Sequence, residues 1–163
     1  MSNYLPVSSQ AYGTEYNQKY IKWNAANIEN VEFQVNKLSP PLIYADESFQ
    51  VIYGISIFTH LSEENHFAWK EELMRVLKVG GILFLTLHGE VFNSKLSYAE
   101  KEKFESGYLV VKSSKTEGHR TYSAYQPVAF VHELFDEHDI VHHKVGKGSG
   151  KLEQDIWIVR KVG

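Results

Sequence analysis

Two histidines stand where a side chain could transfer protons. His60 follows an apolar run over residues 49–55, and His88 follows a second apolar run over residues 82–87. Such runs are typical of strands buried on both faces, and ligands of open α/β sheets bind beyond the carboxyl ends of the strands. An unperturbed imidazole has a pKa of about 6.5, which suits a general acid or base. A histidine that only bonds the local backbone fits the sequence equally well, so both roles remain open.

A metal site is the weaker interpretation of these histidines. Two imidazoles are too few ligands for zinc, and only Glu90 could be added to the pair. His138, His142 and His143 form a cluster by composition. However, neighbouring residues on a strand point to opposite faces of the sheet. We therefore predict no metal site.

The two histidines need a strand–helix–strand unit to position them, and residues 48–89 have that pattern. A helix is expected from about Ser62, with Glu63 and Glu64 favourably placed in its first turn. Lys78 and the Gly80-Gly81 pair are expected to end this helix before the strand at residues 82–87. The predicted buried side of the helix consists of apolar residues: Phe67, Trp69, Leu73, Val76 and Leu77.

The flanking segments continue the alternation of strands and helices. Before the central unit we expect a short strand within residues 9–14, a helix over 18–27 capped by Asn17, and a strand at 31–35. After it we expect a helix at residues 98–104 and a hairpin of residues 108–112 with 121–125. A helix from Pro127 and two final strands, at residues 140–145 and 156–160, complete the chain. This order predicts an α/β fold and a single domain over residues 1–163.

Composition narrows the possible partners. The 163 residues suffice for one domain with a core, and the absence of cysteine excludes disulfides and thiol nucleophiles. A formal net charge of -3 argues against nucleic acid held by bulk charge. No apolar stretch reaches the roughly 20 residues of a membrane helix, and no signal peptide opens the chain. We expect a soluble, cytoplasmic protein that does not bind membranes.

Several stretches together resemble class I S-adenosylmethionine-dependent methyltransferases, of the type 11/12-like kind. YGTEYNQKYIKW is similar to the second strand of that family, and FQVNKLSPPL to the third strand and the following loop. SFQVIYGISIFTHL is similar to the fourth strand and its functional loop, although Gln50 replaces a common Asp. LMRVLKVGGILFLTLHG matches the helix, Gly-Gly turn and fifth strand, with Val79 where Pro is usual. The resemblance implies a Rossmann-like fold, with a mostly parallel sheet and a C-terminal antiparallel strand.

The resemblance also implies which residues hold the cofactor, S-adenosylmethionine, and the acceptor. Glu15 occupies the place of the acidic residue that binds the ribose hydroxyls, since a carboxylate can accept two hydrogen bonds. Many members have an acidic residue in the next loop, where this chain has Asn36 and Lys37. The remaining implied cofactor contacts are Leu38, Ser56 and Ile57. The expected acceptor contacts are Phe58, Thr59 and Tyr125, with Pro127, Gln154 and Asp155 as further candidates. His60 and His88 are the candidate catalytic bases.

One part of the family pattern is not found before Glu15. The first strand and its G-x-G turn should lie there, yet the chain has no glycine before Gly13. Glycine matters because it lets the backbone approach the amino-acid end of the cofactor closely. We therefore expect a chain truncated at its N-terminus, either a fragment or a degenerate relative without the site. Without the first strand, two sheet edges would be left unpaired. The two strands could pair directly, residues 4–8 could fill the gap, or a second chain could. We therefore expect either a homo-oligomer, formed through the exposed sheet edges, or another rearrangement of the sheet.

The sequence thus predicts methyl transfer to an oxygen or nitrogen of a small-molecule acceptor, provided that the cofactor binds. The alternative is a non-catalytic methyltransferase-like domain that acts in self-association or partner binding. A dinucleotide-dependent enzyme ranks last, because it would need a G-x-G-x-x-G turn after its first strand.

Overall fold

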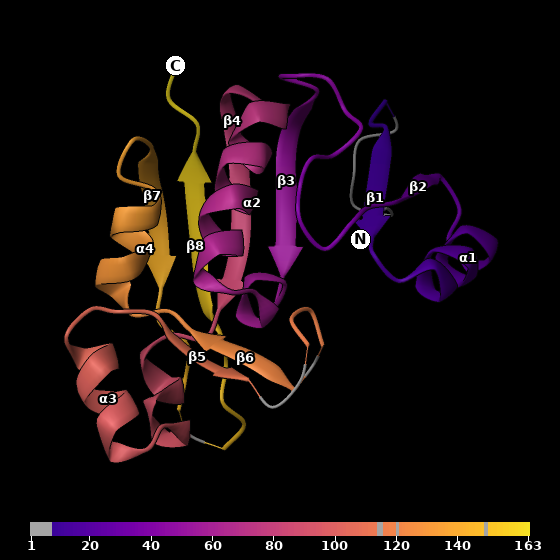
Figure 1. Ribbon diagram of the computed structural model, residues 1–163. Coiled ribbons are helices and arrows are strands. Elements are labelled where there is room, and N and C mark those ends of the chain that lie inside the picture. Colours follow the sequence, from indigo (N-terminus) through magenta and orange to yellow (C-terminus); the bar gives the residue numbers. More distant parts are fainter. Residues whose placement is uncertain (1–7, 114–115, 120, 149) are drawn as a thin grey trace. The chain divides into compact units, whose positions relative to one another are not determined.

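The computed structural model describes residues 8–113, 116–119, 121–148 and 150–163 (Figure 1). Contacts within the chain cluster into two compact units, Met1–Ile43 and Tyr44–Gly163. Each unit has its own sheet. A single domain over residues 1–163 therefore stays a prediction.

The first unit consists of two parallel strands and the helix that connects them. Strand β1 (Ala11–Glu15) leads into helix α1 (Gln18–Asn27), which is followed by strand β2 (Val31–Val35). The side chain of Asn17 accepts a hydrogen bond from the backbone N–H of Lys19, so the predicted helix cap is confirmed. The register pairs Glu15 with Val35. Both strands therefore end at the same level, and Glu15 belongs to β1 rather than lying just beyond it.

The second unit is built on a four-stranded sheet in the order β3-β4-β8-β7. These strands are β3 (Phe49–Ile55), β4 (Leu77–Leu87), β7 (Asp139–Lys144) and β8 (Asp155–Arg160). Strands β3 and β4 are parallel, whereas β8 runs antiparallel to both β4 and β7. Strands β3 and β4 thus have their carboxyl ends at the same edge. The predicted α/β, Rossmann-like fold with an antiparallel strand at its C-terminal end is confirmed, although this sheet is only partly parallel rather than mostly parallel.

Helices α2 (Glu63–Val76) and α4 (Val128–Leu134) lie over one face of this sheet, as Figure 1 shows. Side chains alternate along a strand, and Leu83, Leu85 and Leu87 of β4 are accordingly buried while the residues between them are half-buried. Trp157 and Val159 of β8 are buried as well. The core of this unit therefore lies between the sheet and the two helices.

The end of α2 differs from the prediction. The helix stops at Val76, and β4 already begins at Leu77, so Gly80 and Gly81 lie inside the strand. Gly80 has a φ of 76°, which a residue without Cβ adopts at little cost. The backbone N–H of Gly80 donates to the carbonyl of Lys161, and the N–H of Lys161 donates to the carbonyl of Gly81. These long-range hydrogen bonds extend the sheet where local pattern predicts a helix end.

The buried side of α2 is also more polar than predicted. Phe67 is 36% exposed, whereas the neighbouring His66 is fully buried. Lys70 is buried too, and its ammonium group pairs with Glu71 and Glu137. An apolar pattern does not identify such positions, because a polar side chain is buried only where tertiary partners satisfy it.

A smaller substructure lies beyond the carboxyl ends of β3 and β4 (Figure 1). It contains the predicted antiparallel hairpin, β5 (Val110–Ser113) with β6 (Tyr122–Tyr125), and helix α3 (Tyr98–Glu105). Two short 3-10 turns, η2 (Phe58–His60) and η3 (Glu90–Lys95), follow β3 and β4. The substructure has a hydrophobic cluster of its own, whose members are Leu96, Phe104, Val110 and Tyr125, with Phe92 packed against them.

Strand β3 forms one end of the four-stranded sheet, and β1 belongs to the separate two-stranded sheet. Direct pairing of these two strands stays a prediction. Of the segment proposed to fill the gap, residues 4–7 lie outside the described residues. Among the helices described, none is long and apolar enough to cross a membrane.

Candidate functional site

The first unit brings two predicted cofactor residues together at the ends of its strands. Glu15 closes β1, Asn36 directly follows β2, and the backbone N–H of Asn36 donates to the carbonyl of Glu15 over 3.2 Å. One carboxylate oxygen of Glu15 accepts the backbone N–H of Asn17 at 2.8 Å. This bond fixes the carboxylate at the start of α1, and within the described part of the chain no hydrogen-bond partner is found for its other oxygen.

Asn36 carries a polar atom that the described residues leave unsatisfied. Its amide nitrogen donates to the carbonyl of Lys37 at 2.6 Å, while its Oδ1 is buried and has no hydrogen-bond partner. A buried acceptor without a partner costs free energy, so a donor from a ligand would stabilise it. Lys37 is exposed and Leu38 half-buried in the same loop.

In the second unit, Ser56 lies in a closed hydrogen-bond network at the strand ends. Its backbone N–H donates to the hydroxyl of Thr86, which donates to Oε1 of Gln154 at 2.6 Å. The amide nitrogen of Gln154 returns to the hydroxyl of Ser56 at 2.8 Å. The hydroxyl of Thr59 donates to the carbonyl of Ser56 and lies 3.0 Å from the Ser56 hydroxyl. The polar groups of Ser56 are all hydrogen-bonded within this network. Of the two predicted cofactor contacts Ser56 and Ile57, it is therefore Ile57, 53% exposed, whose side chain is open to a ligand.

Both candidate bases are bound by the same strand, β6. Nδ1 of His60 lies 2.7 Å from the carbonyl of Tyr122, and Nδ1 of His88 lies 3.1 Å from the carbonyl of Ala124. A carbonyl only accepts, so each Nδ1 carries the proton and each Nε2 is left as a free acceptor. Among the described residues, no hydrogen-bond partner is found for either Nε2. The site therefore presents two imidazole acceptors of defined tautomer.

The surroundings of His88 keep it neutral. Its ring stacks on Phe92 at a centroid distance of 4.2 Å and lies 5.4 Å from that of Tyr125. Burial lowers the pKa of His88 to about 4; the hydrogen bond to Ala124 opposes this shift, and the charge of His60 adds to it. This electrostatic coupling is consistent with the predicted proximity of His60 and His88. His88 can thus accept a hydrogen bond at neutral pH, but it is a weak base.

A buried amide holds the loops that carry these histidines. The side-chain nitrogen of Gln126 donates to the carbonyl of Phe58 at 3.2 Å and to Nε2 of His66 at 3.0 Å. Its oxygen accepts the backbone N–H of His88 at 3.0 Å. His66 donates from Nδ1 to the carbonyl of Ser62 over 2.7 Å. The network thus connects the ends of β3 and β4 to the first turn of α2.

The predicted acceptor contacts are mostly enclosed by protein. Phe58 is 2% exposed and Thr59 fully buried, and the ring of Phe58 packs edge-on against His66. Tyr125 is 8% exposed and belongs to the hydrophobic cluster of the smaller substructure. Their role as acceptor contacts stays a prediction.

Sequence reasoning missed Gln126, His66, Phe92 and Glu117. One carboxylate oxygen of Glu117 accepts the backbone N–H of Ser62 at 2.6 Å and the side-chain amide of Asn65 at 2.8 Å. No local signal marks these residues, because their partners lie far away in the chain. The sequence signal that came closest to identifying one of them is the position of Gln126 between the predicted candidates Tyr125 and Pro127.

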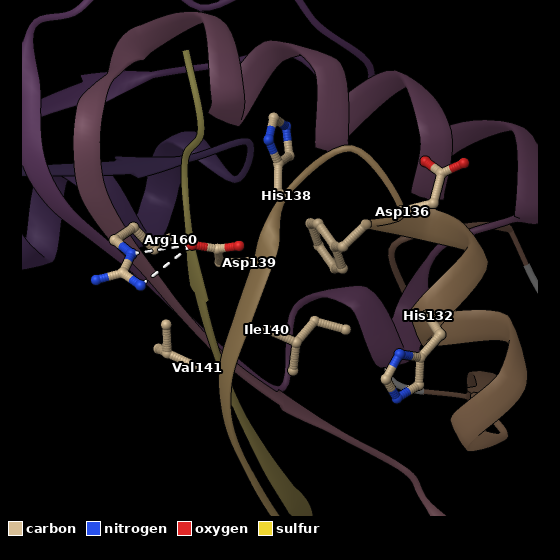
Figure 2. Close-up of a pocket in the computed structure, with 8 residues that line it drawn as sticks. His132, Asp136, His138, Asp139, Ile140, Val141 and Arg160 are labelled. Atoms are coloured by element: carbon tan, nitrogen blue, oxygen red, sulfur yellow. Dashed lines mark hydrogen bonds and ion pairs between the residues drawn. The ribbon is translucent and has the colours of Figure 1, made fainter.

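One cavity lies away from this site. It measures about 770 Å³ and is lined by the ends of α4, β7 and β8, as Figure 2 shows. Arg160 pairs with Ile82 in the register, which places this cavity towards the amino end of β4. The guanidinium of Arg160 already bonds Asp139, and burial lowers the pKa of His138. Among the described residues, no group of three or more His, Cys, Asp and Glu is arranged to hold a metal ion.

Comparisons with known proteins assign the family. A methyltransferase-domain family model matches residues 1–85. Solved structures with the same fold include a SAM-dependent methyltransferase of Methanosarcina mazei, with a TM-score of 0.67, 16% identity, and coverage of 93% of this chain and 81% of the other. An S-adenosylmethionine dependent methyltransferase of Mesorhizobium loti has a TM-score of 0.65, 8% identity, and coverage of 94% and 81%.

A third neighbour is the 1,6-didemethyltoxoflavin-N1-methyltransferase of Burkholderia thailandensis, with bound 1,6-didemethyltoxoflavin and S-adenosylhomocysteine. Its TM-score is 0.67 and its identity 9%, with coverage of 94% of this chain and 62% of that one. No curated protein matches. Identities this low establish the fold alone, but the family match spans more than half of the 163 residues. The chain therefore belongs to the methyltransferase-domain family.

Proposed function

We propose that this chain binds S-adenosylmethionine and transfers its methyl group to an oxygen or nitrogen of a small molecule. The observation that carries the proposal is the pairing of Glu15 with Asn36 at the ends of two parallel strands. Strand ends of this kind are where open α/β sheets bind ligands. The Burkholderia neighbour, an N1-methyltransferase with a small molecule and S-adenosylhomocysteine bound, supports an acceptor of this size.

The residues of the first unit fit the nucleoside end of the cofactor. Glu15 has a free carboxylate oxygen and Asn36 a buried, unpaired Oδ1, so both need donors. A ribose offers two hydroxyl donors and adenine an amino group, which suits these acceptors. Lys37 and Leu38, in the loop that follows Asn36, would add contacts to the base of the cofactor. No G-x-G turn precedes β1 in this sequence, so we assign no residue to the amino-acid end.

His60 and His88 would act on the acceptor. When bound, S-adenosylmethionine supplies an electrophilic methyl group, whose bond to sulfur breaks with its electron pair left on sulfur. Nε2 of His60 would take the proton that the acceptor oxygen or nitrogen loses when it receives the methyl group. Nε2 of His88 would accept a hydrogen bond from the acceptor and orient it, because a pKa of about 4 makes this imidazole a weak base.

Calorimetric titration with S-adenosylhomocysteine tests the cofactor assignment. Glu15→Gln keeps an oxygen for the N–H of Asn17 but removes the charge that favours two hydroxyl donors. We expect binding in the micromolar range, weakened about tenfold or more by this change. Glu32→Gln is the matched control, since Glu32 lies exposed on β2. Equal weakening by the control, or no binding by a folded sample at millimolar ligand, contradicts the assignment.

Self-association is a second candidate function, favoured by one observation. Strand β3 is at the end of its sheet among the described residues, and it contains no charged residue. Uncharged edge strands pair readily with other chains. The molar mass in solution, measured by light scattering on the sample used for calorimetry, distinguishes a monomer from a homo-oligomer. A cytoplasmic location also stays a prediction.

A further inference from the structure

A second cavity opens beside the strand ends of the second unit. It measures about 570 Å³, within the range of about 300–1,000 Å³ that is typical of small-molecule sites. The ends of β3 and β4 border it on one side, through Ile55 and Thr86. The loop that joins β7 to β8 borders it on the other. Of the predicted acceptor contacts, Gln154 lines this cavity, and no predicted role uses the Gly- and Lys-rich loop.

The lining of the cavity is mainly apolar, with cations at two positions. The apolar part comes from Ile55, Phe92, Val145, Leu152 and Ile156. Lys144 and Lys151 line the same cavity and are exposed, and no carboxylate partner for either is found among the described residues. Glu153 is the one acidic residue of the lining. Apolar walls with two cations and one anion favour an apolar molecule that carries a negative charge.

The walls of the cavity are fixed by hydrogen bonds. Gln154 and Thr86 are held by the network that includes Ser56. The loop is anchored by Asp155, whose buried carboxylate accepts the backbone N–H of Gly146 at 2.9 Å and bonds His143 at 2.9 Å. A site whose walls are fixed before binding loses less conformational entropy when a ligand enters.

Phe92 connects the cavity to the candidate bases. Its side chain lines the cavity, and its ring stacks on His88 at 4.2 Å. A molecule in the cavity therefore lies one aromatic ring away from the imidazole that would orient an acceptor. We propose that this cavity binds the methyl acceptor, and that the acceptor is a small apolar or aromatic molecule with one anionic group, held by Lys144 and Lys151. The identification of this molecule as acceptor rests on the proposed function; the binding site itself does not.

The probe for this proposal is 2-naphthoate, an aromatic carboxylate, with the uncharged 2-naphthamide as its matched control. Titrations of the ¹⁵N-labelled chain, followed by amide chemical shifts, give both affinity and location. We expect the shifts to concentrate at residues that line the cavity, and the amide to bind about tenfold more weakly than the acid.

Two variants test the cationic contacts. Lys144→Gln combined with Lys151→Gln should weaken naphthoate about tenfold and leave naphthamide unchanged. Lys147→Gln, in the same loop but outside the lining, should change neither affinity by more than about twofold. Shifts spread over other surfaces, equal binding of acid and amide, or equal weakening by Lys147→Gln would overturn the proposal.

Failure of the cavity and failure of the proposed function give different results. Naphthoate titrations need no cofactor, and S-adenosylhomocysteine titrations need no acceptor. Retained S-adenosylhomocysteine binding without naphthoate binding refutes the cavity alone. Naphthoate binding at the cavity without S-adenosylhomocysteine binding supports the site and refutes its role in methyl transfer.

Discussion

Acid should destabilise this protein through His66, a histidine that the fold holds neutral. His66 is fully buried, its Nδ1 donates to the carbonyl of Ser62, and its Nε2 faces the amide nitrogen of Gln126 at 3.0 Å. A proton on Nε2 of His66 would place this N–H donor against the amide N–H donor of Gln126. Burial lowers the pKa of His66 to about 4, although the hydrogen bond to Ser62 and the charge of Glu117 both oppose this shift.

The size of the effect follows from proton linkage. The unfolded chain binds a proton at His66 near pH 6.5, and the folded chain only near pH 4. Between these values the unfolded state holds more protons, so the free energy of unfolding falls as the pH falls. The gap between the two pKa values corresponds to about 3 kcal/mol, lost in full below about pH 4. His88, whose pKa is also lowered by burial, adds to the loss in the same direction.

Urea unfolding at about pH 7 and about pH 4.5 measures this loss. His66→Phe keeps an aromatic ring against Phe58 and Phe130 and removes the titrating group. The free energy of unfolding that this variant loses between the two pH values should therefore be about 2–3 kcal/mol smaller than the loss of the wild type. His142→Phe is the control, because His142 is exposed on β7, and it should keep the dependence of the wild type. If His66→Phe and wild type lose the same stability in acid, burial of a neutral His66 is not the cause.

Two substitutions test other contacts of the site by urea unfolding. Gln126→Met keeps the shape of a 1% exposed side chain but leaves its three hydrogen-bond partners unpaired. We expect this variant to lose about 3–6 kcal/mol of the free energy of unfolding. The control, Gln50→Met at an exposed position, should lose less than about 0.5 kcal/mol. Equal losses would show that the amide network adds nothing to stability. Gly89→Ala places a Cβ on the carboxylate of Asp155 and should cost about 1–3 kcal/mol, whereas Gly148→Ala meets only ordinary contacts. A Gly89→Ala protein as stable as the wild type contradicts this close packing.

Elements with local signals were predictable from the sequence. Strand β3 has the predicted bounds, Phe49–Ile55, because a short apolar run between polar residues admits few alternatives. Helix α1 starts after the predicted cap Asn17, and α2 starts at Glu63, next to the predicted start near Ser62. The end of α2 was not predictable, because Gly80 and Gly81 pair with Lys161 at the other end of the chain. Local pattern carries no information about such a partner.

The candidate site, like the fold, was predictable where the signal is local and not where it depends on residues far away in the chain. The positions of His60 and His88 after β3 and β4 follow from the strand–helix–strand pattern alone. Their hydrogen bonds to β6 do not, since Tyr122 is 62 residues from His60 and Ala124 is 36 residues from His88. The same holds for Gln126, which lies 60 residues from His66. Sequence thus indicates which loops carry the candidate residues, and tertiary structure decides the hydrogen-bonded state of each group.

The backbone of β6, rather than any side chain, sets the tautomer of both candidate bases. Tyr122 and Ala124 are two residues apart, and carbonyls two residues apart point to the same edge of a strand. One edge therefore accepts a hydrogen bond from Nδ1 of each imidazole. Substituting the side chains of Tyr122 or Ala124 leaves these carbonyls in place, so the two Nε2 acceptors keep their state as long as β6 keeps its position. The position of β6 is in turn fixed by β5 on its other edge, and the hairpin thus acts as a support for the proton-accepting side of the site.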